Sequence, residues 1–423
     1  MASDGGVRRL LLLVPTTSYR VADFLDAAHS LGVEVAVGSN QRQVLEEFAD
    51  GRTVTLDFHD LEKGVGQIVA YADEYPLKAI VAVDEEVTVL AAKASEALGL
   101  PHNAPDAVAA AGNKYRMRTR LANSGLASPE FRLLSTGDDA ARAARECFYP
   151  CVLKPLALSA SRGVIRVDDA QAFVAAFRRI VRILEQPDAG AGGDAARHIL
   201  AEGYIAGTEV ALEGLLRAGR LTPLALFDKP DPLEGPYFEE TIYLTPSRLP
   251  ADIQDAITKA TQRAAAALGL EDGPIHAEMR IVDGVPWVVE IAARSIGGLC
   301  SRILRFGAGV TLEELILSHA LGLPVPSIER EGRAAGVMMI PVPRAGKLRE
   351  VRGLDAARAV AGIEEVTISI AIGGELVPLP EGYKYLGFIF AKAETPEAAE
   401  QALRQAHGAL LFDIGPLNPV AMD

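Results

Sequence analysis

Three short apolar runs in the first hundred residues constrain the fold more than any other feature of the chain. RLLLLVP (9–15), VEVAVGS (33–39) and KAIVAVD (78–84) are continuously apolar, which is typical of strands buried on both faces of a parallel sheet. Residues 19–31 and 85–100 show helical spacing of apolar positions. Strands that alternate with helices predict an open parallel sheet with helices on both faces.

The ends of these strands are candidate ligand contacts. In open parallel sheets, ligands bind beyond the carboxyl ends of the strands. Residues 16–18 and 84–85 occupy such positions. Ordinary loop and capping roles are the alternative for each of them.

The pattern changes near residues 110 and 328, which divides the chain into three units. The middle unit is predicted to contain helices at 113–124, 169–186 and 251–268, strands at 149–156 and 198–221, a small-residue loop at 158–164 and a hairpin at 276–294. The last unit is predicted as a separate α+β module with strands at 336–343, 363–373 and 384–393 and a helix at 395–410. The fold class is therefore α/β and α+β, with domains at 1–110, 111–328 and 329–423.

A glycine-rich stretch at 186–196 is predicted to be a flexible linker. Its glycines, Gly190, Gly192 and Gly193, lack the preceding strand and following helix that a dinucleotide-binding fingerprint requires. No G-x-x-x-x-G-K-S/T motif occurs elsewhere, which excludes a P-loop.

Composition excludes several classes of function. The chain has 42 Lys and Arg against 56 Asp and Glu, a net charge of −14, which disfavours general nucleic-acid binding. The sequence contains no run of 18 apolar residues, so it predicts no membrane span. The three cysteines form no disulfide framework and fit a reducing compartment, so we expect a cytoplasmic protein.

Two lysines and a loop are candidates for binding phosphate. Lys114 begins a predicted helix, and Lys154 lies on the strand VLKP. The loop Ser159-Ala160-Ser161-Arg162-Gly163 has short side chains, which let backbone N–H groups approach a phosphate. A solvated charge is the alternative for either lysine alone.

The hairpin carries two carboxylates that could share a cation. Asp283-Gly284 is a strong hairpin-turn signal, with four residues between Glu278 and Asp283 and five between Gly284 and Glu290. Roughly opposed positions on paired strands place both carboxylates on one face. Mg²⁺ favours one or two carboxylates together with nucleotide phosphates.

Two neighbouring segments remain open to more than one interpretation. His276 lies near Glu278 and could face a substrate or be a satisfied core histidine. A zinc deaminase site is rejected because no P-C-x-x-C motif accompanies His276-Ala277-Glu278. In 236–241 (PYFEET), Tyr237, Phe238, Glu239 and Glu240 could receive an ammonium group; a plain surface loop is the alternative.

Six motifs in order resemble the ATP-grasp superfamily. They are NKYRMRTRLANSGLASPEF, VLKP, the small-residue loop, ILAEGYIAGTEV, HAEMRI and VVEIAARSIGG. Within the superfamily the chain resembles carboxylate–amine ligases of the L-amino acid ligase type. The resemblance implies a pre-ATP-grasp N-terminal domain, a two-lobed ATP-grasp domain with its smaller lobe at about 120–203, and a C-terminal ligase domain.

The resemblance implies an ATP site between the two lobes. Lysines and a flap would bind the phosphates, and the hinge between the lobes would bind adenine and ribose. The implied residues are Lys114 and Lys154 for the phosphates, Ser159, Ser161 and Gly163 in the flap, Glu202, Tyr204 and Ile205 for the adenine, and Glu209 for the ribose.

It also implies a metal and acyl-transfer site. Two glutamates would bind Mg²⁺ or Mn²⁺, and an arginine would stabilise charge on the transferred phosphoryl group and the acyl oxygen. The implied residues are Glu278 and Glu290 for the metal, Arg294 and Lys154 for catalysis, and His276, Tyr237, Glu239, Arg294, Gly297 and Gly298 for the substrate.

The sequence departs from the family pattern at Ala292, where relatives carry a metal-binding Asn.

The sequence leaves three hypotheses for the function. The first is an ATP-dependent ligase that joins a carboxylate to an amine through an acyl phosphate, releasing ADP and phosphate, with an amino acid as one substrate. The others are a bicarbonate-using ATP-grasp carboxylase and a non-catalytic nucleotide-binding protein. Neither nucleic acid nor membrane is an expected partner, and a homodimer is compatible with the resemblance.

Overall fold

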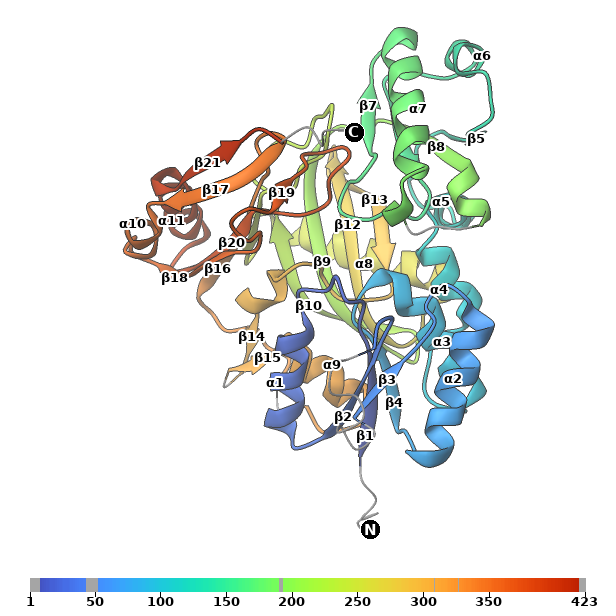
Figure 1. The fold of residues 1–423 in the computed structure, drawn as a ribbon, viewed down its shortest axis with the longest axis vertical. Coiled ribbons are helices and arrows are strands. Elements are labelled where there is room, and N and C mark those ends of the chain that lie inside the picture. Colours follow the sequence, from blue (N-terminus) through green and yellow to red (C-terminus); the bar gives the residue numbers. More distant parts are fainter. Residues whose placement is uncertain (1–7, 43–51, 190–192, 308, 326, 418–423) are drawn as a thin grey trace, which may run out of the picture.

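The computed structural model describes residues 8–42, 52–189, 193–307, 309–325 and 327–417, which form a small upper lobe, a large central sheet and two flanking parts (Figure 1). Gly190 and Gly192 of the predicted linker lie outside the described residues. The described residues beside them form 3₁₀ turns at Pro187–Ala189 and Asp194–Arg197.

The N-terminal sheet is parallel, as predicted. Its strand order is β3-β2-β1-β4. The strands are β1 (Arg9–Leu13), β2 (Glu34–Ser39), β3 (Thr53–Thr55) and β4 (Ala79–Ala82), and the helices are α1 (Val21–Leu31), α2 (Leu61–Glu74) and α3 (Thr88–Ala97). Leu10 and Leu12 face the α1 side, and Leu11 and Leu13 face α2 and α3. The three-residue strand β3 was missed because it carries no apolar run.

The α1 face of this sheet is completed by a helix from much later in the chain. A short hairpin, β14 (Arg305–Phe306) and β15 (Val310–Thr311), leads into α9 (Leu312–Ala320). Leu312, Leu315 and Ile316 pack with Leu10 and Leu12 in one core. The N-terminal sheet therefore buries one face against residues of the middle unit.

The small lobe is an antiparallel sheet in the order β5-β8-β6-β7. Its elements are β5 (Phe131–Ser135), α6 (Ala140–Arg145), β6 (Cys151–Pro155), β7 (Ile165–Val167), α7 (Ala170–Leu184) and β8 (His198–Gly203); α4 (Pro105–Ala111) and α5 (Lys114–Asn123) precede it. Phe173, Phe177 and Ile180 of α7 pack against the sheet, because the apolar face of this amphipathic helix points inward.

The central sheet has eight strands in the order β13-β12-β9-β10-β11-β16-β20-β18. They are β9 (Thr208–Arg217), β10 (Arg220–Asp228), β11 (Ile242–Thr245), β12 (Gly273–Val282), β13 (Val285–Ala292), β16 (Ala334–Ile340), β18 (Ile363–Ile368) and β20 (Gly387–Ala393). Ala277, Met279 and Ile291 pack toward α8 (Ala251–Leu268). Alternate residues point to the opposite face, where the polar candidates lie.

The sheet of the C-terminal region is not separate, which corrects the expected isolated module. β16 pairs antiparallel with β11, so the strands after residue 328 extend the central sheet. A second small sheet contains β17 (Gly346–Arg352), β19 (Glu375–Leu376) and β21 (Leu411–Gly415), accompanied by α10 (Leu354–Arg358) and α11 (Pro396–Ala409). Apolar patterning identifies such strands but does not say which edge they join.

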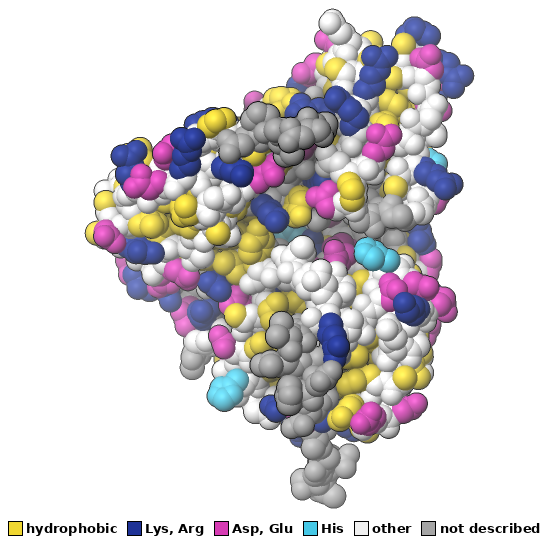
Figure 2. Space-filling view, in the orientation of Figure 1, with side chains coloured by type: hydrophobic (Ala, Val, Ile, Leu, Met, Phe, Trp, Pro, Cys, Tyr) yellow, Lys and Arg dark blue, Asp and Glu magenta, His cyan; other side chains and the backbone are white. Residues whose placement is uncertain are grey.

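The surface is hollowed where the small lobe, the C-terminal region and the N-terminal region meet, and charged side chains gather there (Figure 2). None of the helices in the described ranges has the length and apolarity needed to cross a membrane.

Candidate active site

A bulge in the β12–β13 hairpin places the two predicted metal ligands opposite each other. Val282 pairs with Val285 across the Asp283-Gly284 turn, and Met279 pairs with Val288. The register then shifts by one residue, so that Glu278 pairs with Glu290. This extra residue reconciles the four- and five-residue arms, since a bulge absorbs one residue on one strand. Directly paired residues share a face, so both carboxylates lie on the polar side of the sheet.

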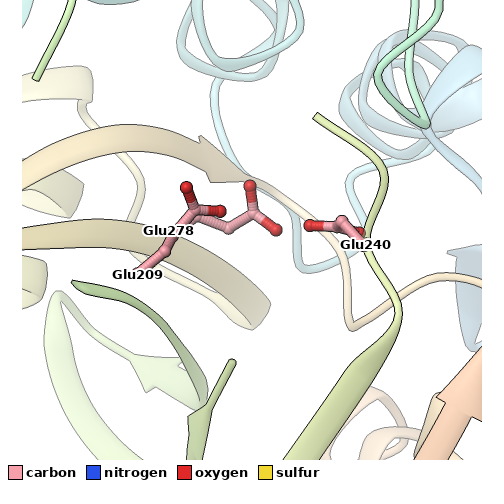
Figure 3. Close-up of side chains that lie close together, drawn as sticks. All are labelled: Glu209, Glu240 and Glu278. Carbon is pink, nitrogen blue, oxygen red and sulfur yellow. The ribbon is translucent and has the colours of Figure 1, made fainter. Parts of the chain in front are cut away.

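The three carboxylates of Glu209, Glu240 and Glu278 surround one lysine. Glu209 and Glu278 come from neighbouring strands, and Glu240 faces them from the loop before β11 (Figure 3). The Lys229 ammonium donates to Glu209 Oε1 at 2.8 Å, to Glu240 Oε1 at 2.5 Å and to Glu278 Oε1 at 2.8 Å. Burial disfavours the charged lysine, but these carboxylates raise its pKa well above the usual value.

His276 is held between two glutamates. Its Nδ1 pairs with Glu213 Oε1, and its Nε2 lies 3.3 Å from Glu278 Oε1. Burial lowers the pKa of His276, but Glu213 and Glu278 together raise it to about 9. The imidazole is therefore protonated at neutral pH and adds positive charge beside Glu278. Of the two interpretations left open, the structure favours a satisfied buried histidine.

Lys154 is paired with Glu202, which also binds a buried arginine. Lys154 Nζ donates to Glu202 Oε2 at 2.5 Å, and Arg118 Nε donates to Glu202 Oε1 at 2.7 Å. Burial raises the pKa of Glu202, but Arg118 and Lys154 lower it to about 2. Both carboxylate oxygens are thus occupied. This placement makes the Glu202 side chain a support for Lys154 rather than an adenine contact.

Arg118 connects this pair to the hairpin bulge. Its Nη1 donates to the carbonyl of Val288 at 2.8 Å and its Nη2 to that of Val289 at 3.1 Å. The side chain has no exposed surface. One guanidinium therefore fixes both the Glu202–Lys154 pair and the bulge that sets the orientation of Glu290.

Lys114, the predicted phosphate contact, lies beside Glu290, the predicted metal ligand. Its Nζ is 3.4 Å from Glu290 Oε2 and donates to the carbonyl of Leu158 at 2.8 Å. The lysine thus contacts both a metal-ligand candidate and the start of the flap.

The flap loop is bent by residues in the left-handed region. Ala160 has φ 51° and Ser161 has φ 55°, a conformation that costs non-glycine residues about 1–2 kcal/mol each. Such strain clusters at functional loops. The N–H of Gly163 donates to the carbonyl of Pro380 at 2.9 Å, so this amide is engaged by the C-terminal region. The predicted phosphate contact by Gly163 therefore does not fit this arrangement, while Ser159 lies on the exposed part of the loop.

Arg294 lies against a carboxylate from the end of the first parallel sheet. Its Nε is 3.0 Å from Glu85 Oε2, and its Nη1 donates to the carbonyl of Ser295 at 2.9 Å. Burial raises the pKa of Glu85, with Glu290 adding to the effect and Arg294 opposing it. The strand-end residue Glu85 therefore lies near Arg294 and Glu290.

A second buried arginine joins the same parts of the chain. Arg20, at the start of α1, donates from Nη2 to Ser295 Oγ at 2.9 Å and to Glu313 Oε1 at 3.1 Å. Ser295 immediately follows Arg294, so this contact fixes the loop that carries the predicted catalytic arginine.

The hinge between the lobes is organised by Arg280. Its Nη1 donates to the Tyr204 hydroxyl at 3.0 Å and to the carbonyl of Ile205 at 2.9 Å, and its Nε donates to Glu209 Oε2 at 2.9 Å. The N–H of Tyr204 donates to the carbonyl of Pro150 at 3.0 Å. The hinge position of these residues agrees with the expected adenine site, but the Tyr204 amide and the Glu209 carboxylate already have protein partners.

Tyr237 packs against the small lobe. Arg179 of α7 donates to its hydroxyl at 2.5 Å, and its ring packs on the small-lobe core. Burial raises the pKa of Glu239, whose carboxylate accepts a hydrogen bond from the backbone of Val342. Glu240, the next residue, is the member of this loop that reaches Lys229. The predicted substrate contacts of Tyr237 and Glu239 are therefore less suited to this site than Glu240.

The glycine pair after Arg294 lies at an aromatic surface. A Cβ on Gly297 would meet open space, whereas one on Gly298 would lie 3.1 Å from the Phe388 ring. Gly298 also has φ +60°, which side chains rarely adopt. A ligand can therefore approach the backbone of Gly297, which the predicted substrate contact of Gly297 requires.

Family models match three successive parts of the chain. Residues 147–303 match the ATP-grasp domain, residues 25–102 the ATP-grasp N-terminal domain, and residues 338–415 the L-amino acid ligase C-terminal domain 2. The chain therefore contains ATP-grasp domains followed by an L-amino acid ligase C-terminal domain. This confirms the resemblance seen in the six motifs and the expected kind of C-terminal domain.

Several of the relatives carry ligase or synthase names. Alanine–anticapsin ligase of Bacillus subtilis (strain 168) is 29% identical over 60% of this chain and 56% of its own length. Dapdiamide A synthase of Enterobacter agglomerans is 30% identical over 57% of this chain and 56% of its own length. The chain thus spans little more than half of each. The crystal structure of an L-amino acid ligase from Bacillus licheniformis superposes with a TM-score of 0.78 at 26% identity, covering 96% of this chain and 98% of that one.

The sequence analysis did not identify three basic residues and one acidic residue as members of the site. Arg118, Lys229, Arg280 and Glu85 all contact predicted site residues. Arg118 and Arg280 lie inside two of the quoted motifs, so their position was a usable signal. Lys229 follows a strand that the sequence analysis did not separate, and Glu85 was noted only as a strand-end residue.

Proposed function

We propose that this chain is an ATP-dependent carboxylate–amine ligase that makes an amide bond through an acyl phosphate and releases ADP and phosphate. An amino acid is one of its substrates. The observation that carries the proposal is the opposed Glu278–Glu290 pair, with Lys114 beside Glu290 and Arg294 on the loop that follows. The ligase relatives and the L-amino acid ligase C-terminal domain support it.

The chemistry explains why these residue types are needed together. A carboxylate is a poor electrophile, so a phosphoryl group is first installed on one of its oxygens. The protein then positions the reactants and neutralises charge on the phosphoryl oxygens. Lys114 and Lys154 supply positive charge for the phosphates, and Arg294 supplies it where the acyl phosphate forms and collapses.

The donor set fits a divalent cation. Glu278 and Glu290 share a face, and every hydrogen bond made to Glu278 by the described residues ends on Oε1, which leaves Oε2 available. When bound, Mg²⁺ would neutralise the nucleotide phosphates. These two glutamates would hold it.

The cytoplasmic setting and the homodimer remain predictions.

A screen for coupled products tests the proposal. Purified protein is mixed with ATP, Mg²⁺ and pairs of amino acids, and ADP, phosphate and product mass are measured. We expect ADP, phosphate and an amide of the pair in equal amounts, with no product when either partner is omitted. Formation of AMP and pyrophosphate would contradict the mechanism. Dependence on bicarbonate would identify a carboxylase instead.

Lys154→Ala should weaken ATP binding by about 10- to 100-fold, the effect of losing a charged hydrogen bond. The reason is that the ammonium offsets phosphate charge in a partly closed site. The measurement is a nucleotide titration by calorimetry. Lys392→Ala is the matched control, since the one ion pair that Lys392 forms with a described residue is to Glu331. An unchanged dissociation constant in Lys154→Ala would count against this nucleotide site.

A further inference from the structure

Two carboxylates of the central sheet and one from the loop before β11 have the arrangement of a metal site. Ligand atoms of Glu209, Glu240 and Glu278 all lie within 4.8 Å of one another (Figure 3). Hard cations such as Mg²⁺ and Mn²⁺ bind oxygen ligands of this kind. By geometry alone the cluster could hold a cation in addition to one held between Glu278 and Glu290.

The ammonium group of Lys229 already lies between these carboxylates. Lys229 Nζ has three N–H donors, and each of the three glutamates lies 2.5–2.8 Å from it. The lysine is 4% exposed. A metal bound here would displace the ammonium from all three partners and leave it buried without them, which is strongly unfavourable.

Glu278 is shared between this cluster and the proposed metal site, one oxygen to each. Its Oε1 accepts from Lys229 at 2.8 Å and from the Tyr243 hydroxyl at 3.3 Å, and it lies 3.3 Å from His276 Nε2. Three donors saturate this oxygen. Glu278 therefore has only Oε2 to offer to a metal, in a monodentate contact.

The neighbouring position adds no further ligand. Ala292 pairs with His276 and lies on the same face as Glu290. Its methyl group cannot coordinate a metal.

We infer that the Lys229 ammonium occupies the second cation position of this active site, so that each chain binds one divalent metal and not two. The inference rests on the proposed function, because the single metal is the one held with ATP by Glu278 and Glu290. Lys229 then joins the hinge carboxylate Glu209, the metal ligand Glu278 and the loop residue Glu240 through one buried ion cluster.

Counting bound Mn²⁺ tests this inference. The protein with ADP is titrated with Mn²⁺, and the free ion is followed by electron paramagnetic resonance. We expect one Mn²⁺ per wild-type chain. Lys229→Met should bind two, because three buried carboxylates without their ammonium would recruit a cation. Lys392→Met, which removes the half-buried ion pair between Lys392 and Glu331, is the control and should bind one.

The outcomes separate the inference from the function on which it rests. Two Mn²⁺ in the wild type, or one in a folded Lys229→Met protein, would overturn the inference. Binding of neither ADP nor Mn²⁺ by the wild type would overturn the proposed function itself. If Lys229→Met does not fold, Glu240→Gln replaces it: a count that stays at one supports the ammonium site, and a count that falls to zero contradicts it.

Discussion

Replacing Arg294 with lysine is expected to lower kcat by about 10²- to 10³-fold, the usual cost of losing a preorganised transition-state contact, while nucleotide binding stays near normal. The guanidinium uses Nε for Glu85 and Nη1 for the Ser295 carbonyl. No hydrogen bond from its remaining nitrogen to a described residue is found, so this nitrogen can donate to a ligand. Lysine has one nitrogen, which cannot hold Glu85 and also reach the oxygens that gain charge.

Two measurements distinguish this role from a general loss of structure. Steady-state kinetics with a substrate pair gives kcat, and calorimetry gives the affinity for ADP. Arg333→Lys is the control, since Arg333 forms an exposed pair with Glu394 and the change should leave kcat unaltered. A normal kcat in Arg294→Lys would show that charge alone suffices. A parallel loss of ADP affinity would place Arg294 in nucleotide binding.

Glu202→Gln should destabilise the protein by about 3–5 kcal/mol, the cost of breaking a buried ion pair by removing one partner. The variant leaves Arg118, which has no exposed surface, and the nearly buried Lys154 without a counter-charge. Urea unfolding of both proteins measures the difference. Glu146→Gln is the control: Glu146 pairs with Arg132 at the exposed surface, and its loss should cost less than about 1 kcal/mol.

The same glutamate predicts a dependence on pH. Burial raises the pKa of Glu202, but Arg118 and Lys154 lower it from 4.5 to about 2. A carboxyl group whose pKa is lowered by folding contributes its full stabilisation at pH values above its pKa in the unfolded chain. This stabilisation is lost as the pH falls through its pKa in the folded protein. The difference between wild type and Glu202→Gln should therefore be largest above pH 4.5 and shrink as the pH falls toward 2. A constant difference across this range would mean that Glu202 acts through shape and not through charge.

Local patterns in the sequence predicted many of the elements and the approximate opposition of Glu278 and Glu290. Continuous apolar runs predicted β1, β2 and β4, and the Asp283-Gly284 turn predicted the hairpin that pairs Glu278 with Glu290. The short strand β3 and the attachment of β16 to β11 were not predicted. Strand length and apolarity are local properties, whereas the choice of a neighbouring strand depends on the whole sheet.

The number of residues on each side of the Asp283-Gly284 turn did not predict the bulge. The unequal arms around Asp283-Gly284 indicated only roughly opposed carboxylates. The register shift between Glu278 and Met279 decided that Glu278 and Glu290 pair directly. Arg118 supports that shift from α5, 170 residues before Val288.

The sequence by itself indicated the ATP-grasp and L-amino acid ligase domains and their order, and it offered candidate residues of the types that phosphate and metal chemistry need. Only the tertiary structure decided which charges meet: Glu202 with Arg118, 84 residues apart, Lys229 with Glu278, 49 residues apart, and Arg294 with Glu85. The reason is physical. Periodicity reports which face of an element is buried, but a buried charge takes its partner from whichever element the fold packs against it.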